Sequence, residues 1–175
     1  TPWSITAERI PAIADNVSHW VVSGSWTTWT STADGSGFSV PYVRVAKSGS
    51  NSISKTLNYL PEGTYTLSAS CMSYYYSKGF LGIGKGEKDV SGVTLFANSA
   101  STKINTKSNK AAKTLSVNVT LSGTNTLKFG INATSSNKAT ILAMDNVELV
   151  FQGSSAEYIG GINKITDSYI SAAAS

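Results

Sequence analysis

The sequence has little charge, one cysteine, one histidine and no long apolar run, and each shortage excludes a class of protein. Charged residues make up 14% of the 175 residues, against about 25% in ordinary soluble domains, which is too few for a coiled coil. The single cysteine, Cys71, excludes an internal disulfide framework. Together with the one histidine, His19, it cannot supply a zinc site rich in those ligands. No apolar stretch approaches the roughly 20 residues that cross a membrane, so we expect no membrane insertion.

The net charge of +4 is spread along the chain and does not form a basic patch. The only arginines are Arg9 and Arg44. The densest lysines are interleaved with Ser, Asn and Thr, as in a solvated loop: Lys103, Lys107, Lys110 and Lys113. Proteins that recognise phosphate backbones cluster Lys and Arg on one face, so we expect no nucleic-acid partner.

Alternation of apolar and polar residues dominates the sequence up to residue 152, which predicts half-buried β-strands. From Tyr65 to Cys71 every second residue is apolar, and the residues between them carry hydroxyls. The same alternation marks 115–121, 127–131 and 147–151, and the turn residues 122–125 predict that the first two of these form a hairpin. The segment 60–63 (LPEG) has the composition of a turn. Many short strands separated by such turns predict an all-β fold, an antiparallel jelly-roll β-sandwich.

We expect one domain with a lead-in and a tail. Residues 1–16 are predicted to lead into the domain and 17–152 to form the sandwich. Residues 153–175 are predicted to be a linker or short helix toward a following domain, because the alternation stops at Gly153. Residues 73–91 are predicted to be a long loop, and such loops in compact domains are usually functional or disordered. The glycines at 82–86 lack the spacing of a phosphate-binding loop and indicate flexibility.

The aromatic residues are the clearest indication of function. Trp26 and Trp29 are three residues apart, so a strand would place them on opposite faces and leave one outside the core. Tyr74, Tyr75 and Tyr76 are consecutive, so the first and third would share a face while Tyr75 points inward. An exposed ring can stack on the C–H face of a sugar while nearby amides or hydroxyls bind its hydroxyl groups. The alternative is that these rings simply pack in the core or at its edge.

Two polar residues are further candidates for ligand contact. Lys55 shares a strand face with Ile53 and Leu57. Either its strand is at a sheet edge and the side chain reaches solvent, or that face borders a polar cleft. Asn98 follows the strand predicted at 93–97 and is placed for a polar contact at its end. A glycosidase would need two carboxylates flanking a bond, and no motif singles out a pair among the ten acidic residues.

Several segments together resemble the galactose-binding-like β-sandwich, a fold shared by many carbohydrate-binding modules. They are 53–57 (ISKTL), 60–68 (LPEGTYTLS), 93–98 (VTLFAN) and 144–149 (MDNVEL), and the resemblance extends over residues 17–152. The arrangement is particularly similar to accessory domains of secreted polysaccharide-degrading proteins of Bacteroidetes. The resemblance implies a jelly roll that binds glycans without catalysis, attachment to a carbohydrate-active enzyme, and frequently a structural calcium. It suggests Asp145, at the start of the last strand, as a metal ligand.

We therefore expect a non-catalytic carbohydrate-binding module, extracellular or at the cell surface, that targets an attached enzyme to a plant or host polysaccharide. The candidates for stacking on the sugar are Trp26, Trp29, Tyr74 and Tyr76, and the candidates for polar contact are Lys55 and Asn98. We expect a monomer with further domains in the same polypeptide. The alternatives are a structural or protein-interaction sandwich that spaces other domains, and a glycoside hydrolase.

Overall fold

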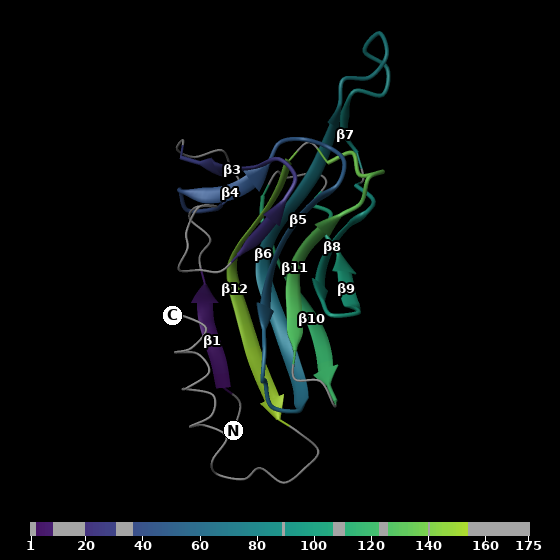
Figure 1. The fold of residues 1–175 in the computed structure, drawn as a ribbon. Coiled ribbons are helices and arrows are strands. Elements are labelled where there is room, and N and C mark those ends of the chain that lie inside the picture. Colours follow the sequence, from purple (N-terminus) through teal and green to yellow (C-terminus); the bar gives the residue numbers. More distant parts are fainter. Residues whose placement is uncertain are drawn as a thin grey trace.

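Two antiparallel β-sheets form the fold in a computed structural model of the chain, which describes residues 3–8, 20–30, 37–88, 90–106, 111–122, 126–139 and 141–153. Seven strands form one sheet: β1 (Trp3–Glu8), β3 (Trp26–Trp29), β4 (Tyr42–Val45), β6 (Gly63–Ser77), β7 (Gly86–Lys88), β10 (Lys113–Leu121) and β12 (Ile141–Gly153). Five form the other: β2 (Val21–Ser23), β5 (Asn51–Leu57), β8 (Val93–Ala97), β9 (Ala100–Lys103) and β11 (Leu127–Ala133). The sheets pack face to face (Figure 1). The predicted all-β sandwich is confirmed.

Strand order shows how the chain crosses between the sheets. The first sheet runs β10-β6-β12-β4-β3, with β1 beside β12 and β7 beside β6, and the second runs β2-β5-β11-β8-β9. The predicted hairpin of 115–121 with 127–131 is wrong, because β10 pairs with β6 whereas β11 pairs with β5 and β8. Both sheets turn an apolar face to the core, so alternation looks the same whichever sheet a strand joins.

The core lies between the sheets and is made by the inward side chains of the strands. Leu67 of β6 and Ile131 of β11 are fully buried, and burial of one such side chain contributes about 1.5–3 kcal/mol. The rings of Tyr65 and Phe151 lie 5.1 Å apart, and the Tyr65 hydroxyl donates a 2.7 Å hydrogen bond to the carbonyl of Pro61. This bond ties the predicted turn before β6 to the core.

The first strand lies before residue 17, the predicted start of the domain. It pairs with the last described strand, from Trp3 opposite Phe151 to Glu8 opposite Val147. The seven-stranded sheet therefore includes residues from the predicted lead-in. His19 and the predicted C-terminal linker or helix beyond Gly153 lie outside the described residues. Within the described residues there is no helix long and apolar enough to span a membrane.

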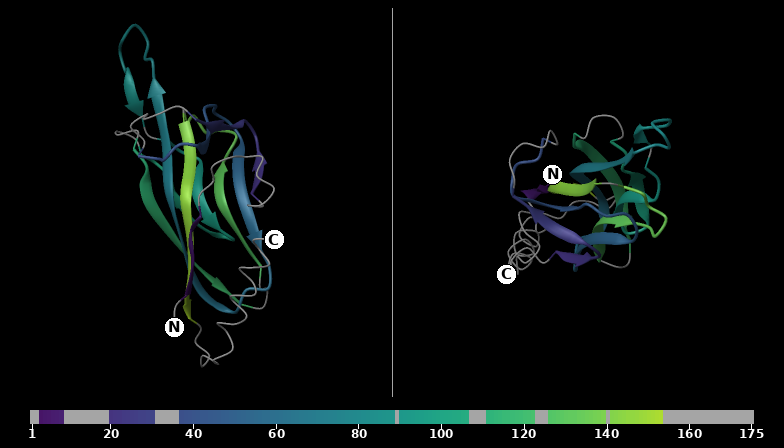
Figure 2. Two further views of the ribbon diagram at one scale, coloured as in Figure 1. Left: turned by 90° about the vertical axis from the view of Figure 1, so that its left-hand side faces the viewer. Right: turned by 90° about the horizontal axis from the view of Figure 1, so that it is seen from above.

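The strand β6 is longer than predicted and leaves the sandwich. It continues through Tyr74–Tyr76 to Ser77, and with β7 it forms a hairpin that projects beyond the sheets (Figures 1 and 2). The segment 73–91, predicted as a loop, thus begins with a strand. Tyr75 packs against the main core, whereas Tyr74 packs on the opposite face of the sheet. Burial on both faces explains why apolar–polar alternation ends here while the strand continues.

The outer face of the seven-stranded sheet has an apolar end and a polar end. At the apolar end, four buried residues and three partly buried ones form what we call the outer cluster: Tyr42, Met72, Ile141 and Ala143, with Trp29, Phe38 and Tyr74. At the polar end, side chains of β6 and β10 bond across the strands at 2.7–3.2 Å: Thr64–Thr120, Thr66–Asn118 and Ser68–Ser116. These polar groups are therefore already engaged with one another.

Candidate functional site

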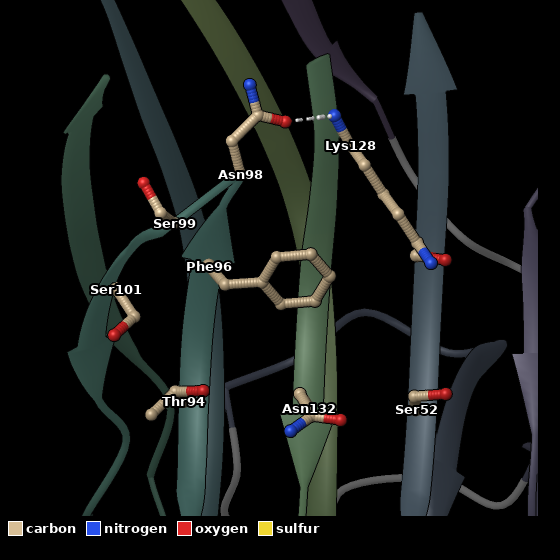
Figure 3. Close-up of a pocket in the computed structure, with 9 residues that line it drawn as sticks. Ser52, Thr94, Phe96, Asn98, Ser99, Ser101, Lys128 and Asn132 are labelled. Carbon is tan, nitrogen blue, oxygen red and sulfur yellow. Dashed lines mark hydrogen bonds between the residues drawn. The ribbon is translucent and has the colours of Figure 1, made fainter. Parts of the chain in front are cut away.

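A depression lies on the outer face of the five-stranded sheet, away from the core. Its volume is about 390 Å³, within the range of about 300–1,000 Å³ that is usual for ligand sites. Nine described residues line it (Figure 3): Ser52, Ser54, Thr94, Phe96, Asn98, Ser99, Ser101, Lys128 and Asn132. We call it the Phe96 depression.

Strand geometry explains why an aromatic residue faces outward here. In β8 the side chains of Val93, Leu95 and Ala97 are buried in the core. Successive residues of a strand point to opposite faces, so Thr94 and Phe96 lie on the outer face. Phe96 is therefore an apolar ring on the otherwise polar side of its strand.

The neighbouring strand leaves room for that ring. Phe96 pairs with Gly130 of β11, and Gly130 pairs on its other side with Ser54 of β5. Gly130 has φ +151°, and a Cβ there would collide with the carbonyl oxygen of Ile53 and lie 2.8 Å from the Cα of Ser54. Figure 3 shows the Phe96 ring reaching from β8 toward β11 with its face toward the viewer. The collision shows how closely β11 approaches β5, and the pairing with a glycine means that no side chain lies directly opposite Phe96 on β11.

Asn98 fixes one edge of the depression. It follows β8 with φ +51°, a conformation that Asn tolerates better than most residues. Its side-chain oxygen accepts a 2.9 Å hydrogen bond from the Lys128 backbone N–H, and its side-chain nitrogen donates to the Thr126 carbonyl at 3.1 Å. Its backbone N–H donates to the Lys128 carbonyl at 2.8 Å. Asn98 therefore extends the pairing of β8 with β11, and its amide retains one N–H and one lone pair for a ligand.

The depression combines groups that suit a polyhydroxylated ligand with an apolar face. Its rim carries two amides, five hydroxyls and the ammonium of Lys128, whose side chain runs from β11 toward β5 (Figure 3). Amides and hydroxyls both donate and accept hydrogen bonds, and the ring offers a flat apolar surface. None of the nine described lining residues has a carboxylate or an imidazole. The acid pair of a glycosidase is therefore not found among them.

The two predicted tryptophans lie elsewhere. Trp26 is in the core, 7% exposed, and its indole N–H donates to the Ser23 carbonyl at 3.2 Å. Its ring is not available for stacking, which corrects that expectation. Trp29 lies on the opposite face of β3, as the three-residue spacing dictates, and packs against the outer cluster. The guanidinium carbon of Arg44 is 3.3 Å from the centre of its ring, so a cation–π contact covers one ring face.

The two predicted tyrosines lie on the other sheet from the depression. Tyr74 pairs with Ile141 and belongs to the outer cluster as one of its partly buried members. Tyr76 is 39% exposed and pairs with Glu87 where the projecting hairpin begins. The structure therefore does not bring the predicted stacking residues together with the Phe96 depression.

Lys55 also points away from the depression. It is 8% exposed, and its ammonium lies 5.8 Å from the centre of the Trp20 ring, which packs edge-on against Phe129. Its strand, β5, lies between β2 and β11 and is not at a sheet edge. Lys55 is on the inner face of β5, whereas Ser52 and Ser54 are on the outer face. Of the two predicted polar candidates, only Asn98 lines the depression.

Asp145, the predicted calcium ligand, lies within a strand. Asp145 is fully buried in β12, opposite Ser70 of β6. Calcium takes six to eight oxygen ligands, and the part of the chain that the structure describes has no group of three or more His, Cys, Asp and Glu side chains able to hold a metal ion. A structural calcium with Asp145 among its ligands stays a prediction, which the effect of EGTA on thermal stability would test.

Two features of the sequence could have located the depression. Phe96 is an aromatic residue between Thr94 and Asn98 on the polar face of an alternating strand. Gly130 lies between Lys128 and Asn132 on the polar face of another. Neither pattern identifies a site alone, because only the pairing of β8 with β11 brings the ring over the glycine.

Solved structures of similar fold include an enzyme and a carbohydrate-binding protein. A cyclase from Fischerella sp. TAU superimposes with a TM-score of 0.60 at 15% identity, covering 89% of this chain and 100% of the cyclase. TmCBM61, solved in complex with β-1,4-galactotriose, gives a TM-score of 0.51 at 16% identity, covering 76% of this chain and 88% of TmCBM61. At these identities the similarity shows the fold alone, and a fold can carry either function.

Sequence comparison identifies the family. No curated protein matches the sequence. The sequence profile described as fimbrillin-like matches residues 25–168, which include all strands from β3 to β12. The resemblance to galactose-binding-like modules therefore holds for the sandwich fold and not for the family. The chain belongs to the fimbrillin-like family.

Proposed function

We propose that this chain is a non-catalytic carbohydrate-binding domain of a secreted or surface protein, and that the sugar binds in the Phe96 depression. The observation that carries the proposal is the half-buried ring of Phe96 above Gly130, surrounded by amides and hydroxyls. A pyranose has a C–H face that can stack on such a ring and hydroxyls that match such a rim.

The fold gives the proposal a precedent. TmCBM61 has a similar sandwich, and its structure contains a β-1,4-linked galactose trisaccharide. We propose a plant or host polysaccharide or oligosaccharide as the ligand class for this chain. We also propose a monomer that directs further domains of the same polypeptide to that polysaccharide.

Catalysis is a weaker candidate than binding. A cyclase shares the fold, so the architecture does not exclude an enzyme. Hydrolysis of a glycosidic bond needs a carboxylate on each side of it. The described lining of the depression offers hydroxyls, amides and one ammonium instead, and these groups suit binding.

A structural role is the second candidate, and the family match favours it. The profile that matches residues 25–168 is described as fimbrillin-like. The name fimbrillin denotes a subunit of fimbriae. A subunit of a surface assembly would associate with other subunits and need not bind sugar. The two roles are compatible if the assembled protein uses the Phe96 depression for adhesion.

Replacement of the stacking ring tests the carbohydrate proposal. We expect the wild-type protein to bind members of an array of neutral and uronate-containing oligosaccharides, the latter because Lys128 places a cation at the rim. For the best ligand found, Phe96→Ala should weaken binding by at least about tenfold, or about 1.4 kcal/mol, in isothermal titration calorimetry.

A matched control separates binding from folding. Tyr59 is 83% exposed between β5 and β6 and does not line the depression, so Tyr59→Ala should keep full affinity. Both variants should melt close to the wild-type protein. If Phe96→Ala folds and keeps its affinity, the sugar site lies elsewhere. If no oligosaccharide binds and the protein self-associates, the structural role is favoured.

A further inference from the structure

The tip of the projecting hairpin exposes three large apolar side chains. Phe80, Leu81 and Ile83 are 79%, 86% and 79% exposed. Single exposed apolar residues are common, but a contiguous exposed group indicates an interaction site. These residues follow β6, on the other sheet from the Phe96 depression, so they form a separate surface.

The tip has a defined shape. Phe80 and Ile83 exchange both backbone hydrogen bonds, at 3.0 and 2.9 Å, and enclose the two-residue turn Leu81-Gly82. Leu81 has φ +51° and Gly82 has φ +83°, as in a type I′ hairpin turn. At Gly79, with φ +67°, a Cβ would collide with the Ile83 carbonyl oxygen. The glycines that indicated flexibility therefore allow a tight, hydrogen-bonded tip.

Leu81 does not suit this turn on conformational grounds. The first position of a type I′ turn has positive φ and favours Asn, Asp or Gly, whereas the conformation is costly for a larger side chain. At 86% exposure, Leu81 has almost no packing that could offset this cost. Tyr59 combines positive φ and exposure in the same way, but Leu81 lies beside two further exposed apolar side chains, Phe80 and Ile83. This grouping points to contact with something outside the domain.

The charges beside the tip indicate what that partner is. Lys78 and Lys85 are exposed on the two arms of the hairpin, and residues 77–86 include no acidic residue. The side chains of lysines beside an apolar tip can reach back so that the ammonium groups stay in a polar layer. A bilayer with anionic lipids offers the complementary arrangement, with phosphates above an apolar region.

We propose that this hairpin tip docks on a bilayer that contains anionic lipids. Phe80, Leu81 and Ile83 enter the interface, and Lys78 and Lys85 lie at the level of the phosphates. The hairpin projects beyond the sheets (Figures 1 and 2), so the tip reaches a flat surface while the sandwich stays in water. Such shallow contact needs no membrane-spanning run. It also needs no pocket shaped to the tip, which a protein partner would have to supply.

Vesicle binding by the full chain tests the proposal. We expect the protein to co-sediment with vesicles of phosphatidylcholine and phosphatidylglycerol, and much less with phosphatidylcholine alone. Leu81→Asn should lower the partition coefficient roughly tenfold. Because Asn suits the type I′ turn, the variant should fold with an unchanged or higher melting temperature. Loss of binding would then not be a consequence of unfolding.

Charge and position have their own controls. The double variant Lys78→Gln/Lys85→Gln should lose most of the preference for phosphatidylglycerol. Tyr59 is equally exposed but lies before the start of β6, at the other end of the strand from the tip. Tyr59→Asn should therefore leave the partition coefficient unchanged. Phe96→Ala should do the same, because sugar and lipid are assigned to different surfaces.

A fluorescence measurement distinguishes lipid from protein contact. A Leu81→Cys variant labelled with a polarity-sensitive dye should shift its emission to the blue when phosphatidylglycerol vesicles are added. Equal partition of the wild-type protein and Leu81→Asn would overturn the proposal, as would no binding to either vesicle. Self-association that Leu81→Asn abolishes, without a lipid-dependent shift, would assign the tip to a second copy of the chain instead.

Discussion

Phe96 and Leu81 are apolar side chains at positions where local structure favours a polar one, and they differ in how the chain supports them. Phe96 is half-buried and lies over the bare backbone of Gly130, so its ring is held on one side and open on the other. Leu81 is held only through its own turn. We therefore expect an ordered stacking surface at Phe96, and at Leu81 a side chain that changes rotamer readily on a backbone turn of defined shape.

The thiol of Cys71 gives a pH-dependent prediction. Burial raises its pKa from 9.0 to about 12, because the thiolate would lose its solvation. Above pH 9 the unfolded state loses the proton first, so the free energy of unfolding should fall as pH rises from 9 toward 12. The fall attributable to Cys71 should approach about 1.4 kcal/mol per pH unit.

Urea denaturation on both sides of pH 9 measures this effect, with Cys71→Ala as the reference. The reference lacks the thiol but keeps the tyrosines and lysines that titrate in the same range. An identical pH dependence in the two proteins would contradict the prediction. The buried thiol should also resist thiol reagents in the folded protein and react once the chain unfolds.

At the scale of single elements, the sequence predicts strands well and their partners poorly. The stretches 64–71, 115–121, 127–131 and 147–151 all form strands, because an inward apolar face repeats every second residue. Pairing depends on contacts far apart in the chain, which alternation does not encode. The turn-like residues 122–125 therefore suggested a hairpin, whereas β10 and β11 belong to different sheets.

The projecting hairpin shows a second limit. Its turn has the sequence Leu-Gly, whereas the usual signal for such a turn is Asn-Gly or Asp-Gly. The turn residues therefore do not predict a hairpin. The strand before it has consecutive aromatics because both of its faces are covered there. Each departure from the usual pattern makes the element look like a loop in the sequence.

The central strand β11 should tolerate no side chain at Gly130. Alanine there would bring a Cβ against the backbone of β5 at Ile53 and Ser54, and its φ of +151° is strained for any other residue. We expect Gly130→Ala to lower the free energy of unfolding by about 2–4 kcal/mol, measured by chemical denaturation. Lys128→Ala, on the same exposed face, should change it by less than about 0.5 kcal/mol. Equal stability of the two variants would contradict the close approach.

At the scale of the whole molecule, the fold class could be predicted and the candidate site only in part. Period-two alternation and many short segments imply a sandwich whatever the strand order. The site depends on that order, because Ser54, Gly130 and Phe96 meet only where β5, β11 and β8 lie side by side. Of the predicted ligand contacts, Asn98 lines the depression, whereas Trp26, Trp29, Tyr74, Tyr76 and Lys55 do not.

Removal of the C-terminal segment tests the domain boundary. The described sheet ends at Gly153, and the residues beyond it lack the alternation of the strands. We expect deletion of 154–175 to shift the melting temperature by less than about 2 °C. The family match continues to residue 168, so a loss of several degrees would show that part of this segment belongs to the folded unit.

The pairing of β1 with β12 has a mechanical consequence. Trp3 lies opposite Phe151 and Glu8 opposite Val147, so the chain enters and leaves this strand pair at the same end. Hydrogen bonds of an antiparallel pair are perpendicular to the strands. Tension applied through residues 3 and 153 would therefore break the hydrogen bonds between β1 and β12 one after another, and would not load all of them at once. β1 would peel away at low force while the strands behind it remain closed, so a protein pulled at both ends would lengthen before the Phe96 depression is disturbed.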